Sequence, residues 1–383
     1  MSTYTQKHSA TKRTFWAVAI FYLLIAFEFF YMASPFAIYF YSVYGPGLTF
    51  INSTPALAWL CRMFLPHVAE TSSVLLNLHN VVGAILAGIG FLGFCIGAGQ
   101  VYYYKIARKG TVTGGIYNFI RHPQYISLAI CSFGLLLLWP RYIVLLSFIA
   151  ILFAYYFLSK IEESECEERF GEAYIEYKNR TGMFLPLRVS FVNQLPSLPK
   201  SGLKRYLAIT TLYVIASVAA IGLANGLESW SLKSLYALYF KDAVYISVTK
   251  VEKDTLERIV NTALANPEVQ TRLESSSSGV SPKFINYVLP VELYVSEIPM
   301  NPVKGAEGHH FVPRDYNENF YRIVFTRAEL RSKHEMEGKG ILLKTVKRAP
   351  VIEARVDLSQ NQVVGIEDPP TSVRYQNIPV PLY

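Results

Sequence analysis

Five runs of mostly apolar residues lie within residues 1–227, and they constrain the fold more than any other feature of the sequence. The runs cover residues 15–33, 74–99, 123–138, 142–158 and 206–224. A helix needs roughly 20 apolar residues to cross the ~30 Å hydrocarbon layer of a membrane, and most of these runs approach that length. The sequence therefore predicts an α-helical polytopic membrane protein with about five transmembrane helices.

Charged residues divide the chain into two regions of different character. Residues 1–227 contain 17 Lys and Arg but only 9 Asp and Glu, whereas residues 228–383 contain 19 of each kind. All of the net charge of +8 therefore belongs to the first region. We interpret these basic residues as topology determinants in short loops, and we expect no nucleic-acid partner, because such a partner needs a basic patch on a soluble face.

The same basic residues predict the orientation of the chain in the membrane. They concentrate in the N-terminus and in residues 100–125 and 159–205, while the loops of opposite orientation hold only Arg62 and Arg141. Cytoplasmic loops carry the excess of Lys and Arg. We therefore expect a multi-pass protein of the cytoplasmic (inner) membrane with a cytoplasmic N-terminus and an extracytoplasmic C-terminal domain.

Residues 228–383 are expected to form that C-terminal extramembrane domain, of the α+β class. Alternating apolar residues predict a strand at Ala243–Thr249, and apolar residues at helical spacing predict an amphipathic helix from Asp254 to Leu273. Further strands are predicted at Val288–Val295, Tyr321–Thr326, Ile341–Val346, Val351–Leu358 and Val363–Ile366. The four cysteines all lie in the first region without paired spacing, so neither a disulfide framework nor a metal site is expected.

Small residues are unusually frequent in the run at 74–99. Glycine and alanine on membrane helices allow two helices to approach closely, which is our main interpretation of this run. The Gly97-Ala98-Gly99 sequence at its end also leaves room for a cofactor beside the backbone.

Two polar motifs flank the apolar residues between positions 123 and 158. The first is Arg121-His122-Pro123-Gln124-Tyr125 and the second is Glu162-Glu163, with a turn expected at Trp139-Pro140-Arg141. If the apolar residues form two antiparallel helices, both motifs return to the same membrane face. The sequence thus predicts one polar site built from the two ends of a helical hairpin.

The residues from about Gly90 to Pro186 resemble the isoprenylcysteine carboxyl methyltransferases and related membrane phospholipid methyltransferases. Each matching segment is short, but their order and spacing around the hairpin are specific. The segments are Thr113–Tyr117, Arg121–Tyr125, Trp139-Pro140, Glu162-Glu163 and Phe170–Tyr174, followed by Tyr177, Arg180 and Pro186. The resemblance covers about a quarter of the chain.

This resemblance implies S-adenosylmethionine as the cofactor, entered from the cytosol, and a lipophilic methyl acceptor from the bilayer. Arg121 and His122 suit the cofactor's carboxylate. Glu162 or Glu163 suits its ammonium group or ribose hydroxyls. The other candidate cofactor-binding residues are Tyr117 and Tyr125, which offer aromatic faces, and Gly97 and Gly99, which correspond to a glycine pair in the phospholipid methyltransferases.

Arg180 and Glu163 are the candidate catalytic residues, with Arg180 orienting an anionic acceptor. Taken singly, Arg121 also fits a positive-inside anchor, and the acidic run at 162–168 also fits the solvated start of a cytosolic helix.

The acceptor is left open between a prenylcysteine-like carboxylate and another isoprenoid or lipid. A phospholipid N-methyltransferase is one alternative, and a non-catalytic subunit that keeps the methyltransferase scaffold is another. Residues 228–383 have no counterpart in the resemblance, so we expect them to bind a protein partner or a lipid-linked substrate. Membrane lipids are expected partners of the helices.

Overall fold

The computed structural model describes residues 16, 19–20, 23, 37–107, 112–186, 202–276, 282–303, 310–311, 316–330, 336–370, 379 and 382–383. The chain forms two compact units. One contains Met1–Phe29 and Leu78–Leu223, and the other contains Phe30–Asn77 and Ala224–Tyr383. The apolar run predicted at 15–33 lies almost entirely outside the described residues.

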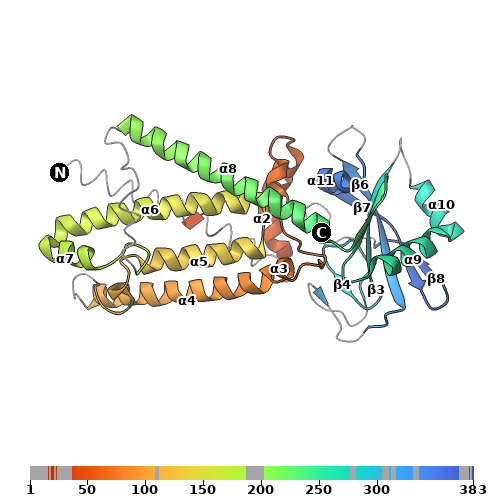
Figure 1. Cartoon of the computed structure of the whole chain (residues 1–383), viewed down its shortest axis with the longest axis horizontal. Coiled ribbons are helices and arrows are strands. Elements are labelled where there is room, and N and C mark those ends of the chain that lie inside the picture. Colours follow the sequence, from red (N-terminus) through yellow and green to blue (C-terminus); the bar gives the residue numbers. More distant parts are fainter. Residues whose placement is uncertain are drawn as a thin grey trace. The chain divides into compact units, whose positions relative to one another are not determined.

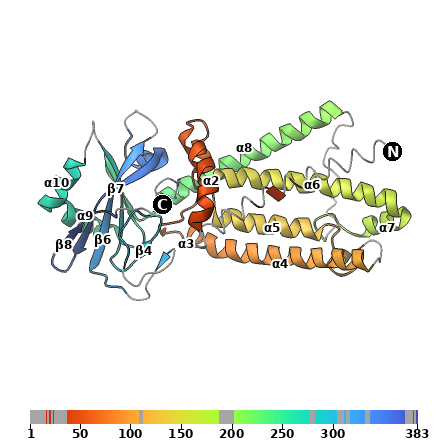
Figure 2. The same ribbon diagram turned by 180° about the vertical axis from the view of Figure 1, so that it is seen from behind.

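The first unit is helical (Figure 1). Its elements are α4 (His79–Ile106), the short 3-10 helix η2 (Gly115–Asn118), α5 (Pro123–Leu138), α6 (Tyr142–Phe170), α7 (Glu172–Arg180) and the first part of α8 (Gly202–Ser234). Helices α4, α5 and α6 run side by side in both Figure 1 and Figure 2. The short α7 follows the end of α6, where the chain turns back toward η2.

Three of the described helices are long and apolar enough to cross a membrane, namely α4, α6 and α8. Helix α5 is equally apolar but has only 16 residues, which corresponds to about 24 Å of helix. An apolar helical region is therefore confirmed, while the count of five spans remains a prediction.

Helices α5 and α6 begin where the sequence predicts, whereas the run predicted at 74–99 is divided into α3 (Val74–Asn77) and α4, and α8 begins earlier, at Gly202. Helices α4, α6 and α8 all continue beyond the predicted ends. Helix α6 runs twelve residues beyond the apolar run because the sequence that follows is rich in Glu, which favours helix. It ends at Gly171, whose φ of +56° is a conformation that glycine adopts easily. The acidic motif at 162–163 thus lies on α6 itself.

Glycines bring α4 and α5 into close contact. A Cβ atom on Gly90 would lie 2.3 Å from the backbone nitrogen of Cys131, and one on Gly134 would lie 2.3 Å from the nitrogen of Ala87. No side chain fits at such distances, so these positions allow the two backbones to approach. The prediction that the small residues serve helix packing is confirmed.

The second unit contains a six-stranded mixed sheet in the order β1-β2-β3-β6-β7-β8. Strands β2 and β3 pair in parallel, and the other neighbours pair antiparallel. The strands are β1 (Ala237–Tyr239), β2 (Ala243–Ser247), β3 (Lys283–Pro290), β6 (Phe320–Leu330), β7 (Thr345–Asp357) and β8 (Gln362–Glu367). A separate pair joins β4 (Tyr294–Val295) to β5 (His310–Phe311).

Each face of the sheet carries its own hydrophobic core. Helices α9 (Lys253–Leu264) and α10 (Pro267–Ser275) pack on one face through side chains such as Ile259 and Val269. Helix α11 (Lys339–Lys344) packs on the other face. The remaining elements of this unit are α2 (Ala37–Ser53), the 3-10 helix η1 (Ala58–Cys61), α3 (Val74–Asn77) and the end of α8.

The α+β class predicted for the C-terminal region is confirmed, with three corrections of detail. The strand predicted at Val288–Val295 lies earlier in the chain, because β3 spans Lys283–Pro290 and a turn separates it from β4. The predicted helix at 254–273 is two helices, because Asn266 caps a new helix that starts at Pro267. The strand predicted at Ile341–Val346 is wrong, since residues 339–344 form α11 and β7 begins only at Thr345.

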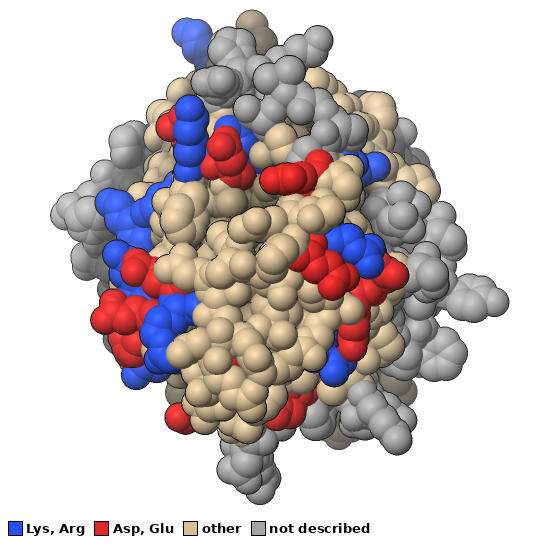
Figure 3. Space-filling model, turned by 90° about the vertical axis from the view of Figure 1, so that its right-hand side faces the viewer, with Lys and Arg blue, Asp and Glu red and all other residues tan. Residues whose placement is uncertain are grey.

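Figure 3 shows one face of the molecule, on which charged side chains surround an area without them.

Candidate functional site

A cavity of about 390 Å³ lies in the helical unit, between the two ends of the α5–α6 hairpin. Its volume falls within the roughly 300–1,000 Å³ that small-molecule sites occupy. The lining residues are Val101, Val112, Tyr117, Arg121, His122, Gln124, Tyr125, Glu162, Glu165, Cys166, Arg169, Phe170, Tyr174 and Tyr177. The two polar motifs of the sequence therefore do converge on one site.

Arg121 is held by several protein groups at once. Its Nε lies 2.7 Å from Oε1 of Glu163, and its Nη1 donates hydrogen bonds to the backbone carbonyls of Lys178 and Thr181. Its side chain is only 9% exposed. Most of the guanidinium is thus engaged within the protein, although the residue still borders the cavity.

The segment after α7 fixes the backbone of the first motif. The amide of Arg121 donates to the carbonyl of Gly182 over 2.9 Å, and the amide of His122 donates to the carbonyl of Met183 over 3.1 Å. The hydroxyl of Tyr177 on α7 donates to the carbonyl of Tyr117 over 2.7 Å. These hydrogen bonds hold the turn before α5 against α7 and the segment that follows it.

The two neighbouring glutamates of the second motif face different surroundings. Consecutive helical residues point about 100° apart. Glu163 is 1% exposed and lies behind the cavity, where Lys178 approaches its Oε2 to 3.4 Å. Glu162 is 42% exposed and lines the cavity.

His122 lies between these two carboxylates. Its Nδ1 is 3.5 Å from Oε2 of Glu162, and its Nε2 is 3.5 Å from Oε1 of Glu163. Burial lowers the pKa of His122, but the two carboxylates outweigh burial and raise the pKa above its ordinary value. The site therefore favours the protonated, cationic imidazole.

Aromatic rings complete the wall beside His122. The Tyr125 ring stacks on His122 at 5.7 Å and on Tyr155 at 4.9 Å between centroids. The Tyr125 hydroxyl donates to Oε1 of Glu162. Burial raises the pKa of Tyr177 to about 12, so its phenol stays protonated and remains a hydrogen-bond donor.

The predicted site residues Gly97, Gly99 and Arg180 are not among the lining residues of the cavity, although Gly97 contacts a residue that is. The Tyr117 hydroxyl donates to the carbonyl of Gly97 over 3.4 Å. Gly99 is exposed, and a Cβ atom there would meet nothing within 4 Å. Arg180 is exposed on α7, with its guanidinium 5.7 Å from the ring centre of Tyr177. The roles predicted for Gly99 and Arg180 remain predictions.

Several residues that line the cavity are not among the site residues predicted from the sequence. Gln124 lies within the first motif, and Tyr174 had been noted only as part of the family pattern. Glu165, Cys166 and Arg169 line the cavity from α6. Their spacing from Glu162 of three, four and seven residues is that of one helix face, and this signal was available in the sequence.

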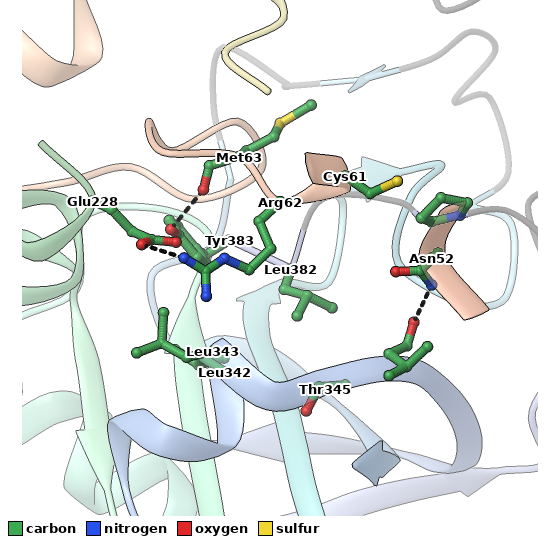
Figure 4. Close-up of a pocket in the computed structure, with 12 residues that line it drawn as sticks. Asn52, Cys61, Arg62, Met63, Glu228, Leu342, Leu343, Thr345, Leu382 and Tyr383 are labelled. Atoms are coloured by element: carbon green, nitrogen blue, oxygen red, sulfur yellow. Dashed lines mark hydrogen bonds and ion pairs between the residues drawn. The ribbon is translucent and has the colours of Figure 1, made fainter. Parts of the chain in front are cut away.

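The second unit contains a smaller cavity of about 50 Å³ (Figure 4). In it, Nη2 of Arg62 lies 2.8 Å from Oε2 of Glu228, and the Tyr383 hydroxyl donates to the carbonyl of Met63 over 3.0 Å. The volume suits about one or two water molecules. We therefore place the candidate site in the larger cavity.

Comparison with known proteins supports this choice of region. Residues 81–173 match the family model for phospholipid methyltransferases. The matched segment contains α5, α6 and both polar motifs, so the family resemblance is confirmed for this part of the chain.

The chain is also similar in sequence to a methyltransferase of a fungus. The chain is 30% identical over 118 residues to a protein-S-isoprenylcysteine O-methyltransferase of Schizosaccharomyces pombe. The match covers 26% of this chain and 49% of the relative, so the chain spans about half the length of that protein. No solved structure gives a significant match to the chain.

Proposed function

We propose that the chain is a membrane methyltransferase that uses S-adenosylmethionine to methylate a lipophilic acceptor. The observation that carries this proposal is the convergence of His122, Tyr125 and Glu162 on one cavity within the family-matched segment. A prenylcysteine-like carboxylate or another isoprenoid or lipid is the proposed acceptor. The name of the fungal relative supports an isoprenylated acceptor.

The residues present in the cavity fit this cofactor. S-Adenosylmethionine carries an adenosine, an amino-acid group and a sulfonium, and when bound it supplies an electrophilic methyl group. The cavity offers aromatic faces, carboxylates and cationic groups together. His122 lines the cavity between Glu162 and Glu163, which places a cationic imidazole beside the exposed carboxylate of Glu162.

The protein's own groups would act mainly by binding and orientation. Tyr117 and Tyr125 offer π faces to adenine or to a cation, and Glu162 offers an acceptor for hydroxyl or ammonium groups. An acceptor that is already a carboxylate needs no general base. Catalysis would then come from holding the two reactants in line and excluding water.

Glu163 and Arg180 have different proposed roles. Glu163 is buried behind the cavity, so we propose that it acts by holding Arg121 and His122. Arg180 remains our proposal for orienting an anionic acceptor, with its contact to Tyr177 as the link to the cavity wall.

Phospholipid N-methylation is the second candidate, favoured by the description of the matching family. Expression in a host that lacks methylated phosphatidylethanolamine separates the two candidates. New methylated lipids, detected by mass spectrometry, would favour the phospholipid acceptor. An unchanged lipid profile with turnover of a prenylcysteine analogue would favour the first proposal.

For the topology, we propose five spans with a cytoplasmic N-terminus, a membrane domain at residues 1–227 and an extracytoplasmic domain at residues 228–383. The distribution of basic residues supports this orientation. A periplasmic reporter fused after Leu227 should be active, and an inactive reporter would contradict the proposed orientation.

Calorimetric titration of the purified chain with S-adenosylmethionine tests the proposed function directly. We expect saturable binding that is lost in His122→Ala. A folded protein without measurable heat would instead favour a non-catalytic subunit, whose C-terminal domain binds a protein partner. Wild-type affinity in His122→Ala would refute the proposed site.

A further inference from the structure

The cavity-facing side of α6 continues beyond Glu162. Glu165, Cys166 and Arg169 follow at helical spacing, and all three line the same cavity. They cover about two further turns toward the end of the helix. One wall of the cavity therefore presents a carboxylate and a guanidinium that the proposed roles so far have not used.

Arg169 is an available cation. Its side chain is exposed, its guanidinium lies 5.3 Å from the ring centre of Phe170, and it forms no ion pair with a described residue. Arg121 differs, because Glu163 and two backbone carbonyls already engage its guanidinium. A ligand carboxylate thus meets less competition at Arg169 than at Arg121.

Glu165 is the matching anion. It is partly buried, lines the cavity four residues before Arg169, and forms no ion pair with a described residue. Residues four apart on a helix are neighbours, with Cβ atoms about 5–6 Å apart. The pair thus places a carboxylate and a guanidinium next to each other on one wall of the cavity.

We propose that Glu165 and Arg169 form the subsite for the zwitterionic amino-acid group of the methyl donor. Glu165 accepts from the ammonium, and Arg169 donates to the carboxylate. This assignment rests on the proposed function, since it presupposes that S-adenosylmethionine binds in the cavity. It leaves Arg121 with a positioning role.

Three probes separate the parts of the donor. S-Adenosylmethionine has both the ammonium and the carboxylate, decarboxylated S-adenosylmethionine has only the ammonium, and 5′-methylthioadenosine has neither. Binding of each probe is measured by calorimetry on the full chain in lipid nanodiscs. The variants are Glu165→Gln and Arg169→Gln, with Arg205→Gln as a matched control because Arg205 is an exposed arginine on α8.

Loss of one charge-assisted hydrogen bond should weaken binding about 10- to 100-fold. Arg169→Gln should show this loss for S-adenosylmethionine only. Glu165→Gln should show it for both ammonium-bearing probes. Neither variant should change the affinity for 5′-methylthioadenosine, and Arg205→Gln should match the wild type throughout.

The outcomes distinguish the subsite from the proposed function. If the wild type binds S-adenosylmethionine but each variant loses affinity equally for all three probes, or loses none, the subsite is refuted and the proposed function stands. If the folded wild type binds none of the probes, both proposals fail. Thermal unfolding shows that each variant is folded, and wild-type affinity for 5′-methylthioadenosine shows that a selective loss for the other probes does not reflect misfolding.

Discussion

Arg121 and Glu163 are 42 residues apart in the sequence, yet the Nε of one lies 2.7 Å from the Oε1 of the other. The ion pair joins the residues before α5 to the last turns of α6. Both side chains are buried, and Lys178 adds a second cation to Glu163 from α7. This arrangement fixes the wall of the cavity on which His122 lies.

Replacing Glu163 with Gln should destabilise the helical unit by about 3–5 kcal/mol, because the buried Arg121 would lose its countercharge. Thermal unfolding in detergent or nanodiscs measures the effect. The double variant Arg121→Gln/Glu163→Gln should lose less than the sum of the two single changes.

Glu172→Gln is the matched control for this experiment, since Glu172 is exposed at the start of α7. Its unfolding temperature should equal that of the wild type. A Glu163→Gln protein as stable as this control would show that the ion pair does not hold the site together.

Tyr177→Phe should cost about 1–2 kcal/mol, because the carbonyl of Tyr117 would lose a buried hydrogen bond of 2.7 Å. The affinity for S-adenosylmethionine should fall as well, since Tyr117 forms part of the cavity. Tyr206→Phe, at an exposed position on α8, is the control for loss of a hydroxyl. Equal stability of the two variants would rule out a structural role for this hydrogen bond.

His122 should make stability depend on pH. The pKa of His122 is raised in the folded chain, so the folded protein binds the proton of His122 more tightly than the unfolded chain does. The stabilising contribution is complete below the unfolded pKa of about 6.5 and is lost as pH rises through the higher folded pKa. Unfolding temperatures of the wild type and His122→Gln should therefore converge with rising pH, and a constant difference between them would contradict the raised pKa.

The hairpin could be predicted from the sequence because its signals are local. Pro123 suits the first turn of a helix, and the Trp139-Pro140 pair ends one helix before Tyr142 starts the next. The convergence of the two motifs follows from this topology alone. The family pattern then indicated the chemistry.

The separate roles of Glu162 and Glu163 could not be predicted in the same way. Both are adjacent carboxylates in one acidic run, and only the packing of α7 and the position of Arg121 determine which one is buried. The error at 341–346 has a similar origin. The consecutive residues Ile341, Leu342 and Leu343 fit a short buried strand equally well, but in the structure they belong to α11, which covers one face of the sheet.

Gly90 and Gly88 offer a test of the contact between α4 and α5. A Cβ atom at Gly90 would lie 2.3 Å from the nitrogen of Cys131, whereas one at Gly88 would meet nothing within 4 Å. Gly90→Ala should therefore destabilise the unit by about 1–3 kcal/mol through overpacking. Gly88→Ala should be neutral or slightly stabilising, because alanine favours helix over glycine.

Since the backbone rather than a side chain blocks the space at position 90, α4 and α5 must move apart to accept the methyl group. That shift would also displace Tyr125, so Gly90→Ala should weaken donor binding while Gly88→Ala should not. Equal stability and equal affinity of the two variants would contradict the close approach of these helices.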